Sequence, residues 1–149
     1  MYKDFDKWNM LKKKIENRQS VYANTREIWW CHLGVNIGSE SCGKNELFER
    51  PVLILKIFGK ENILVIPLTS KDKNIYNHVS INTEGSYSYG MIEQVKVVSS
   101  RRLSRKISRL RRSIFTGVQE EIFSKMFPNE NPLCIAGDLG ALGPSSDMI

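Results

Sequence analysis

The sequence predicts a mainly β fold with helices, in which short strands bend into a small barrel and helices precede and follow it. Short stretches rich in β-branched and aromatic residues recur at close spacing through the middle of the chain, as in a small barrel and unlike a layered parallel sheet. Towards both ends the apolar residues recur with helical spacing instead. A length of 149 residues with a 41% apolar share fits one domain around one modest core.

The N-terminal segment, residues 4–18, has the pattern of an amphipathic helix. Phe5, Trp8, Leu11 and Ile15 fall on one helical face, and most of the lysines fall elsewhere. We expect the apolar face to pack on the domain, with a helix bound to a membrane surface as the alternative. The polar residues that follow are expected to form a linker to the first strand.

Five strands are predicted from short apolar runs that end at turn residues. They are expected at residues 26–33, 51–58, 62–68, 78–81 and 91–98, with polar loops at 37–49 and 70–77 and a turn region at 82–90. Gly59-Lys60-Glu61 joins the second and third strands and is a hairpin signal. Trp29 and Trp30 point to opposite faces of the first strand, so one belongs to the core and the other is free for a dimer contact or base stacking.

Positive charge is concentrated in one segment towards the C-terminus. The formal net charge is +6, and residues 101–112 hold seven positive side chains and no acid, so the rest of the chain sums to about −1. Leu103, Ile107 and Leu110 are spaced as on one face of a helix, so we expect a basic helix. Its surface can attract RNA, an acidic protein or an anionic lipid surface, or can simply be solvated.

A second amphipathic helix is predicted after the basic segment. Phe115, Val118, Ile122 and Met126 form its apolar face, and the helix should end before Pro128. Residues 128–149 show no periodicity and are expected to form a flexible tail.

Several classes of site and compartment find no support in the sequence. No apolar run approaches the roughly 20 residues of a membrane span, and the N-terminus lacks a signal-peptide core, so a soluble, cytoplasmic protein without membrane contact is expected. Cys31, Cys42 and Cys134 lie far apart and include no Cys-x-x-Cys pair, which argues against disulfides and a zinc site. His32 and His78 lack the spacing of metal ligands, so neither a metal nor a cofactor is expected.

Polar side chains occur where the apolar strands begin and end. Arg50 opens one predicted strand, and Thr69 and Ser70 close the next. Because rigid strands fix geometry while their ends reach solvent, these positions are candidates for a functional site.

A series of short motifs runs through the same region in a fixed order. The motifs are Glu27-Ile28-Trp29-Trp30, Gly38-Ser39-Glu40, Arg50-Pro51-Val52-Leu53, Thr69-Ser70, Ile92-Glu93-Gln94-Val95-Lys96 and Arg102-Leu103. This ordered series resembles the MazF/PemK family of toxin endoribonucleases. The resemblance covers residues 26–127, which are expected to form the barrel domain, preceded by the helix and linker at residues 1–25. It implies a small SH3-like bent β-barrel of the CcdB/MazF type.

The family resemblance implies a metal-independent endoribonuclease that cuts single-stranded RNA at short sequences through the ribose 2′-hydroxyl. It also implies a homodimer that a cognate antitoxin neutralises. Arg50 and Thr69 match the catalytic residues of the family, and an arginine fork can hold two phosphoryl oxygens as charge develops. The residues expected in the RNA groove are Ser39, Glu40, Ser70, Glu93 and Gln94. Glu93 also offers a carboxylate for proton transfer. The basic residues expected to contact RNA or the antitoxin are Arg102, Arg105 and Arg109.

Departures from the compact family members leave specificity and function open. Residues 41–49 make a longer connection before Arg50 than in the compact members. Position 39 is a serine, whereas some relatives have a histidine there. Both ends of the chain also carry extra residues. Phe48 in this connection is either a base-stacking group or an anchor of the loop. The alternative functions are a non-catalytic, CcdB-like toxin that poisons gyrase by protein contact and a degenerate RNA-binding module.

Overall fold

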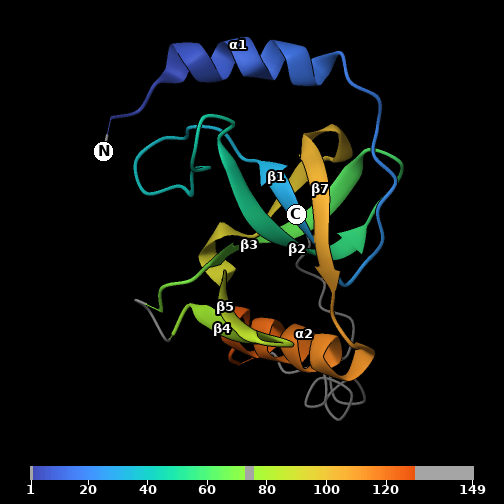
Figure 1. The fold of residues 1–149 in the computed structure, drawn as a ribbon. Helices are drawn as coiled ribbons and strands as arrows, with labels where there is room; N and C mark the ends of the chain where they lie inside the picture. The colour runs from blue at the N-terminus through green and yellow to red at the C-terminus, as the bar shows by residue number, and fades with distance from the viewer. Residues whose placement is uncertain (1, 73–75, 130–149) are drawn as a thin grey trace, which may run out of the picture.

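The computed structural model describes residues 2–72 and 76–129 of the chain, and two helices flank its strands (Figure 1). In chain order the elements are α1 (Phe5–Glu16), β1 (Glu27–His32), β2 (Glu49–Ile57), β3 (Asn62–Thr69), β4 (His78–Thr83), β5 (Ser86–Met91), the 3₁₀ turn η1 (Ile92–Gln94), β6 (Lys96–Ser99), the 3₁₀ turn η2 (Ser100–Arg102), β7 (Leu103–Arg109) and α2 (Arg112–Met126). Helix α1 lies across one end of the strands, and α2 lies at the opposite end beside β4 and β5 (Figure 1). The predicted tail lies outside the described residues from residue 130 onward. No described helix is long and apolar enough to cross a membrane.

The described strands form one antiparallel seven-stranded sheet with the order β4-β5-β3-β2-β1-β7, and β6 pairs with β3 beside this path. Strand β3 changes partners along one of its edges. Its residues 62–65 pair with β6, whereas Leu68 and Thr69 pair with β5. Pro67, which has no N–H to donate, lies between the two ladders. The predicted α+β fold with a small bent sheet is confirmed, although the sheet is bent without closing into a barrel.

Both faces of the central strands are buried, so the apolar runs of β2 and β3 are nearly continuous. Val52 and Ile54 of β2 belong to one cluster together with Leu103 of β7. Leu53 belongs to a second cluster, which the apolar face of α2 covers with Phe115, Val118 and Ile122. The core that the sequence predicted as a single unit is therefore divided between the two faces of one sheet.

The basic segment predicted as a helix is a strand, so that prediction is wrong. After η2 the chain enters β7, which pairs antiparallel with β1, for example Arg105 with Trp30. The apolar face of the predicted helix includes Ile107, but in β7 this residue is 46% exposed. Pairing with β1 covers an edge whose N–H and C=O groups would otherwise lack partners. The hydrogen bonds gained at that edge outweigh the helical spacing of the apolar residues.

The region between β4 and β6 also differs from the prediction. Gly85, with φ 94°, turns the chain tightly from β4 into β5, so most of the turn predicted at residues 82–90 is strand. The strand predicted at residues 91–98 divides into η1 and β6. The helices predicted near both ends are confirmed as α1 and α2.

The two described cysteines, Cys31 and Cys42, are free thiols. Burial raises the pKa of the Cys31 thiol to about 12, so this side chain behaves as a small apolar group. Cys134 lies outside the described residues.

Candidate active site

Arg50 and Thr69 lie side by side at one end of the hairpin that β2 and β3 form in the middle of the sheet. Strands β2 and β3 form an antiparallel hairpin, so the first residues of β2 lie beside the last residues of β3. The register pairs Val52 with Pro67 and, two residues further along, brings Arg50 beside Thr69. Thr69 also pairs with Tyr89 of β5. The hairpin predicted from sequence therefore brings together the two residues expected to form the centre of the site.

The guanidinium of Arg50 is oriented by backbone carbonyl groups. Its Nε donates to the carbonyl oxygen of Cys42 at 2.8 Å, and its Nη1 donates to that of Leu68 at 3.1 Å. Within residues 2–72 and 76–129 it forms no ion pair with a carboxylate. Burial lowers its pKa, and the nearby Cys42 thiol opposes that effect. The remaining N–H groups form an oriented cationic fork suited to an anionic ligand.

Arg50 and Thr69 line a pocket of about 300 Å³. The lining residues are Trp30, Lys44, Asn45, Glu49, Arg50, Pro51, Leu68, Thr69, Ser70 and Ser88. The Thr69 hydroxyl oxygen accepts a hydrogen bond from the Lys71 amide at 3.2 Å, which leaves its own proton for a ligand. The pocket thus combines a cationic fork, three hydroxyl groups and one aromatic wall.

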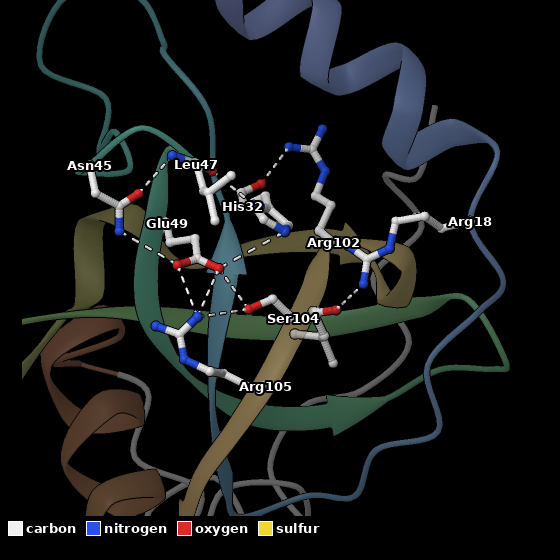
Figure 2. A network of polar contacts seen from close by, with 9 residues as sticks. Arg18, His32, Asn45, Leu47, Glu49, Arg102, Ser104 and Arg105 are labelled. Carbon is white, nitrogen blue, oxygen red and sulfur yellow. Dashed lines mark hydrogen bonds and ion pairs between the residues drawn. The ribbon is translucent and has the colours of Figure 1, made fainter.

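A buried carboxylate directly precedes Arg50 in the chain. The Glu49 side chain is 1% exposed and accepts hydrogen bonds from Ser104 Oγ at 2.6 Å and from Arg105 Nη1 at 3.2 and 3.3 Å (Figure 2). Desolvation raises the pKa of Glu49, but these hydrogen bonds outweigh it and hold the pKa below its usual value. The network ties the beginning of β2 to β7 and keeps the carboxylate ionised at neutral pH.

The two adjacent tryptophans have different roles. Trp29 packs against the buried cluster on its face of the sheet and donates its indole N–H to Glu27 at 2.9 Å. Trp30 lines the pocket, and the Arg105 guanidinium carbon lies 4.9 Å from the centre of its ring. The alternation predicted from sequence is confirmed, and it assigns the non-core tryptophan to the site.

A family model described as PemK-like, MazF-like toxin of type II toxin-antitoxin system matches residues 24–124. The chain belongs to this toxin family. The matched segment begins just before β1 and ends within α2, so it contains Arg50 and Thr69 and excludes α1.

Solved structures of MazF proteins share the fold of this family member. The Mycobacterium tuberculosis toxin MazF-mt6 is 21% identical over 68% of this chain and 96% of its own, with a TM-score of 0.51. MazF from Deinococcus radiodurans is 17% identical over 71% of this chain and 97% of its own, with a TM-score of 0.56. A mycobacterial endoribonuclease in complex with its cognate antitoxin is 10% identical over 83% of this chain and 100% of its own, with a TM-score of 0.52. A comparison with curated protein sequences gave no significant match.

Most of the other residues expected in the RNA groove of this PemK/MazF-like protein lie outside the pocket. The residues absent from its lining are Ser39, Glu40, Glu93 and Gln94. Gln94 holds the loop between β1 and β2, because its Oε1 accepts from the Ser41 amide at 2.8 Å and its Nε2 donates to the Ser39 carbonyl at 3.3 Å. Ser70 is the member of the predicted groove set that lines the pocket.

The three arginines of the predicted basic helix have different environments. Arg102 donates to the His32 carbonyl at 3.2 Å (Figure 2), and its guanidinium carbon lies 5.6 Å from the centre of the Trp8 ring. Arg105 binds the buried carboxylate described above. Arg109 lines a separate groove of about 690 Å³ beside the turn between β4 and β5. These three side chains therefore do not form the single basic face that a helix would have presented.

The two histidines contact a backbone carbonyl group and carboxylate side chains. His32 Nδ1 lies 2.8 Å from the Leu47 carbonyl oxygen (Figure 2). His78 is buried, with Nδ1 3.3 Å from Asp72 Oδ1 and Nε2 4.0 Å from Glu93 Oε1. In the part of the chain that the structure describes, no group of three or more His, Cys, Asp and Glu side chains is placed to hold a metal ion.

Sequence reasoning missed Glu49 and Ser104 as parts of the site. Their only sequence signal is an acid directly before the Arg50-Pro51 pair and a serine within a basic segment. Neither signal indicates that the two side chains meet, because their contact depends on how β7 lies relative to β1 and β2.

Proposed function

We propose that this protein is a toxin-type endoribonuclease that cleaves single-stranded RNA at short specific sequences and is neutralised by a cognate antitoxin. Membership of the PemK/MazF toxin family supports the proposal. The fold shared with a mycobacterial endoribonuclease solved with its cognate antitoxin supports it as well. The proposal includes a homodimer as the active form and a reaction that needs no metal ion.

The environment of Arg50 carries this proposal. Its guanidinium is partly buried, is held by two carbonyl oxygens and has no carboxylate partner among the described residues. Burying a cation without a counter-ion costs free energy, so the arrangement favours binding of an anion. A phosphodiester has two non-bridging oxygens that match the arginine fork, and Thr69 and Ser70 add hydroxyl donors beside it.

In the proposed reaction the ribose 2′-oxygen attacks the neighbouring phosphorus. The O2′–P bond forms and the P–O5′ bond breaks, while the 2′-hydroxyl loses its proton and the departing 5′-oxygen gains one. The products end in a 2′,3′-cyclic phosphate and a 5′-hydroxyl. Arg50 stabilises the negative charge that develops on the phosphoryl oxygens, and Thr69 donates a hydrogen bond to one of them.

The remaining pocket residues fit a single-stranded substrate. Trp30 offers a stacking surface to an unpaired base next to the scissile phosphate. Glu49 is a poor proton acceptor because its pKa is lowered and its oxygens are already bound by Ser104 and Arg105. We therefore propose that Glu49 fixes the beginning of β2 and does not take part in proton transfer.

The test is cleavage of a long single-stranded RNA by the purified protein in EDTA, with the product ends mapped by sequencing. We expect cyclic-phosphate ends at a few recurring short sequences. Arg50→Ala should lower the single-turnover rate by about 10²–10³-fold, the usual cost of removing a donor to developing charge, and Thr69→Ala should lower it by at least about tenfold.

Matched controls are available on α2, away from the pocket. Arg112→Ala and Thr116→Ala remove the same residue types at exposed positions and should leave the cleavage rate unchanged. If Arg50→Ala keeps its circular dichroism spectrum and cuts at the wild-type rate, the assignment of the site is wrong. Cleavage that requires an added divalent cation would refute the metal-independent reaction.

A further inference from the structure

Helix α1 lies before the segment that defines the family, yet it docks on the loop that supports Arg50. The family match begins at residue 24, whereas α1 spans Phe5–Glu16. The loop between β1 and β2, residues 33–48, lies beside α1 (Figure 1) and supplies the Cys42 carbonyl that accepts from Arg50. The contacts between helix and loop are both apolar and polar.

Trp8 of α1 is the apolar contact. Its side chain is 7% exposed and meets Phe48 edge to face, with ring centres 5.7 Å apart and an interplanar angle of 61°. It also lies so close to Gly34 that a Cβ built there would come within 2.1 Å of Trp8 Cε2. Phe48 is 9% exposed, so it anchors the loop and does not serve as a base-stacking group. Both ends of the loop thus pack directly on Trp8.

Lys3 and Asn36 form one polar contact, and Lys7 of α1 also forms an ion pair with Glu46 of the loop. Lys3 Nζ donates to the carbonyl oxygens of Asn36 at 2.7 Å and Gly38 at 2.9 Å. The Asn36 side chain donates to the Ser41 carbonyl at 2.7 Å, and the Asn36 amide donates to Cys42 Sγ at 3.2 Å. A short series of hydrogen bonds therefore links Lys3, two residues before α1, to Cys42.

Cys42 is one of two anchors of the Arg50 guanidinium. The other anchor, the Leu68 carbonyl, belongs to β3 and is fixed by the sheet. The Cys42 carbonyl belongs to a loop, so its position depends on what holds that loop. Gln94 also holds this loop through Ser39 and Ser41, and the Gly43 amide donates to the Gly34 carbonyl. Removing the contacts from α1 would therefore loosen the Cys42 anchor while the Leu68 anchor stays fixed by the sheet.

We propose that α1 positions the active site: Trp8 and Lys3 hold the loop so that the Cys42 carbonyl fixes the orientation of the Arg50 guanidinium. Trp8 and Lys3 are positioning residues, because neither lines the pocket. The effect on RNA cleavage rests on the proposed function, whereas the effect on Arg50 geometry does not. A displacement of a catalytic group by about 1 Å is enough to lower a reaction rate by about 10²-fold.

The geometry is tested in the full chain through the ¹⁵N–¹H signal of Arg50 Nε, assigned by its loss in Arg50→Lys. Trp8→Ala should shift this signal and speed its hydrogen exchange by about tenfold or more, and Trp8→Phe should restore most of the wild-type behaviour. Lys3→Ala, which removes two hydrogen bonds and leaves the apolar contact of Trp8 in place, should shift it in the same direction and decides the test if Trp8→Ala fails to fold. Ile122→Ala in α2 is the control for general loss of core packing and should leave the signal in place. An unchanged Arg50 signal in the folded variants would overturn the proposal.

Cleavage kinetics on the same samples separate this inference from the proposed function. We expect Trp8→Ala to lower kcat by about 10–100-fold with KM nearly unchanged, since the pocket remains but the guanidinium is misaligned. If the Arg50 signal shifts and the wild type cuts no RNA, the endoribonuclease proposal fails while the positioning role stands. If the wild type cuts RNA and Trp8→Ala retains the wild-type kcat, the positioning role is refuted while the nuclease proposal stands.

Discussion

Replacing Glu49 by glutamine tests whether the charge of this buried side chain, and not only its shape, secures the beginning of β2. The substitution keeps the side-chain volume. It removes the negative charge from the group that accepts hydrogen bonds from Ser104 and Arg105. We expect Glu49→Gln to lower the free energy of unfolding by about 2 kcal/mol at pH 7.

The expected magnitude comes from two unequal contacts. Buried hydrogen bonds to a charged group contribute about 1.5–3 kcal/mol, but the Arg105 side chain is 57% exposed, so its share is closer to the roughly 1 kcal/mol of a solvated ion pair. The Ser104 hydroxyl can still donate to the amide oxygen of glutamine. Only the difference between a charged and a neutral acceptor is lost there, which is again about 1 kcal/mol.

The pH dependence has a definite sign. The folded-state pKa of Glu49 lies below the ordinary value of 4.5, so its stabilisation is fully present above about pH 4.5 and is lost as the pH falls through the folded-state pKa. The stability difference between wild type and Glu49→Gln should therefore be constant above about pH 5 and shrink in acid.

Urea unfolding monitored by circular dichroism at a series of pH values measures both quantities. Glu84→Gln is the control, because Glu84 pairs with Arg111 at a site where its side chain is 79% exposed, and the change should stay within about 0.5 kcal/mol. A Glu49→Gln effect below about 0.5 kcal/mol at pH 7, or one that persists undiminished in acid, would refute this explanation of the network.

Two further substitutions have definite outcomes. Desolvation raises the pKa of Glu27, but hydrogen bonds led by Lys106 bring it from 4.5 to about 2, which corresponds to about 3 kcal/mol of stability at pH 7. Acid unfolding should show the wild type losing that advantage over Glu27→Gln between about pH 4.5 and 2, and parallel curves would contradict it. Gly34→Ala places a Cβ at φ 81° against Trp8 and should cost about 2–4 kcal/mol in thermal or urea unfolding. A stability within about 0.5 kcal/mol of wild type would mean that Trp8 is not tightly docked on Gly34.

The centre of the site was predictable because it depends on a single hairpin. Two apolar runs joined by Gly59-Lys60-Glu61 indicate antiparallel strands, and the opening residue of one then lies beside the closing residue of the other. That rule accounts for the proximity of Arg50 and Thr69, whereas their proposed catalytic role comes from the family resemblance. The opposite orientations of Trp29 and Trp30 follow from the alternation of side chains along a strand.

The rest of the site depends on contacts between distant segments, which local patterns do not contain. The spacing of apolar residues in residues 103–110 fits a helix, yet the segment covers the open edge of β1 and forms β7. That pairing places Ser104 and Arg105 over Glu49, so the error in secondary structure also hid the network. Gln94 shows a related limit, since nothing in its local sequence indicates that its side chain forms hydrogen bonds with the backbone of Ser39 and Ser41.

The change of partners along β3 has a mechanical consequence for the pocket. Ser88 belongs to β5, whereas Thr69 and Arg50 both belong to the β2–β3 hairpin. Only two residue pairs, Leu68 with Gly90 and Thr69 with Tyr89, join β5 to β3 in the described sheet, which makes this its shortest ladder. A displacement of β5 at those pairs would move the Ser88 hydroxyl relative to the Arg50 guanidinium and would leave the ladders of β2 with β1 and β3 intact. The position of the Ser88 hydroxyl in the pocket therefore depends on the shortest ladder of the described sheet, whereas Arg50 and Thr69 are held by its central hairpin.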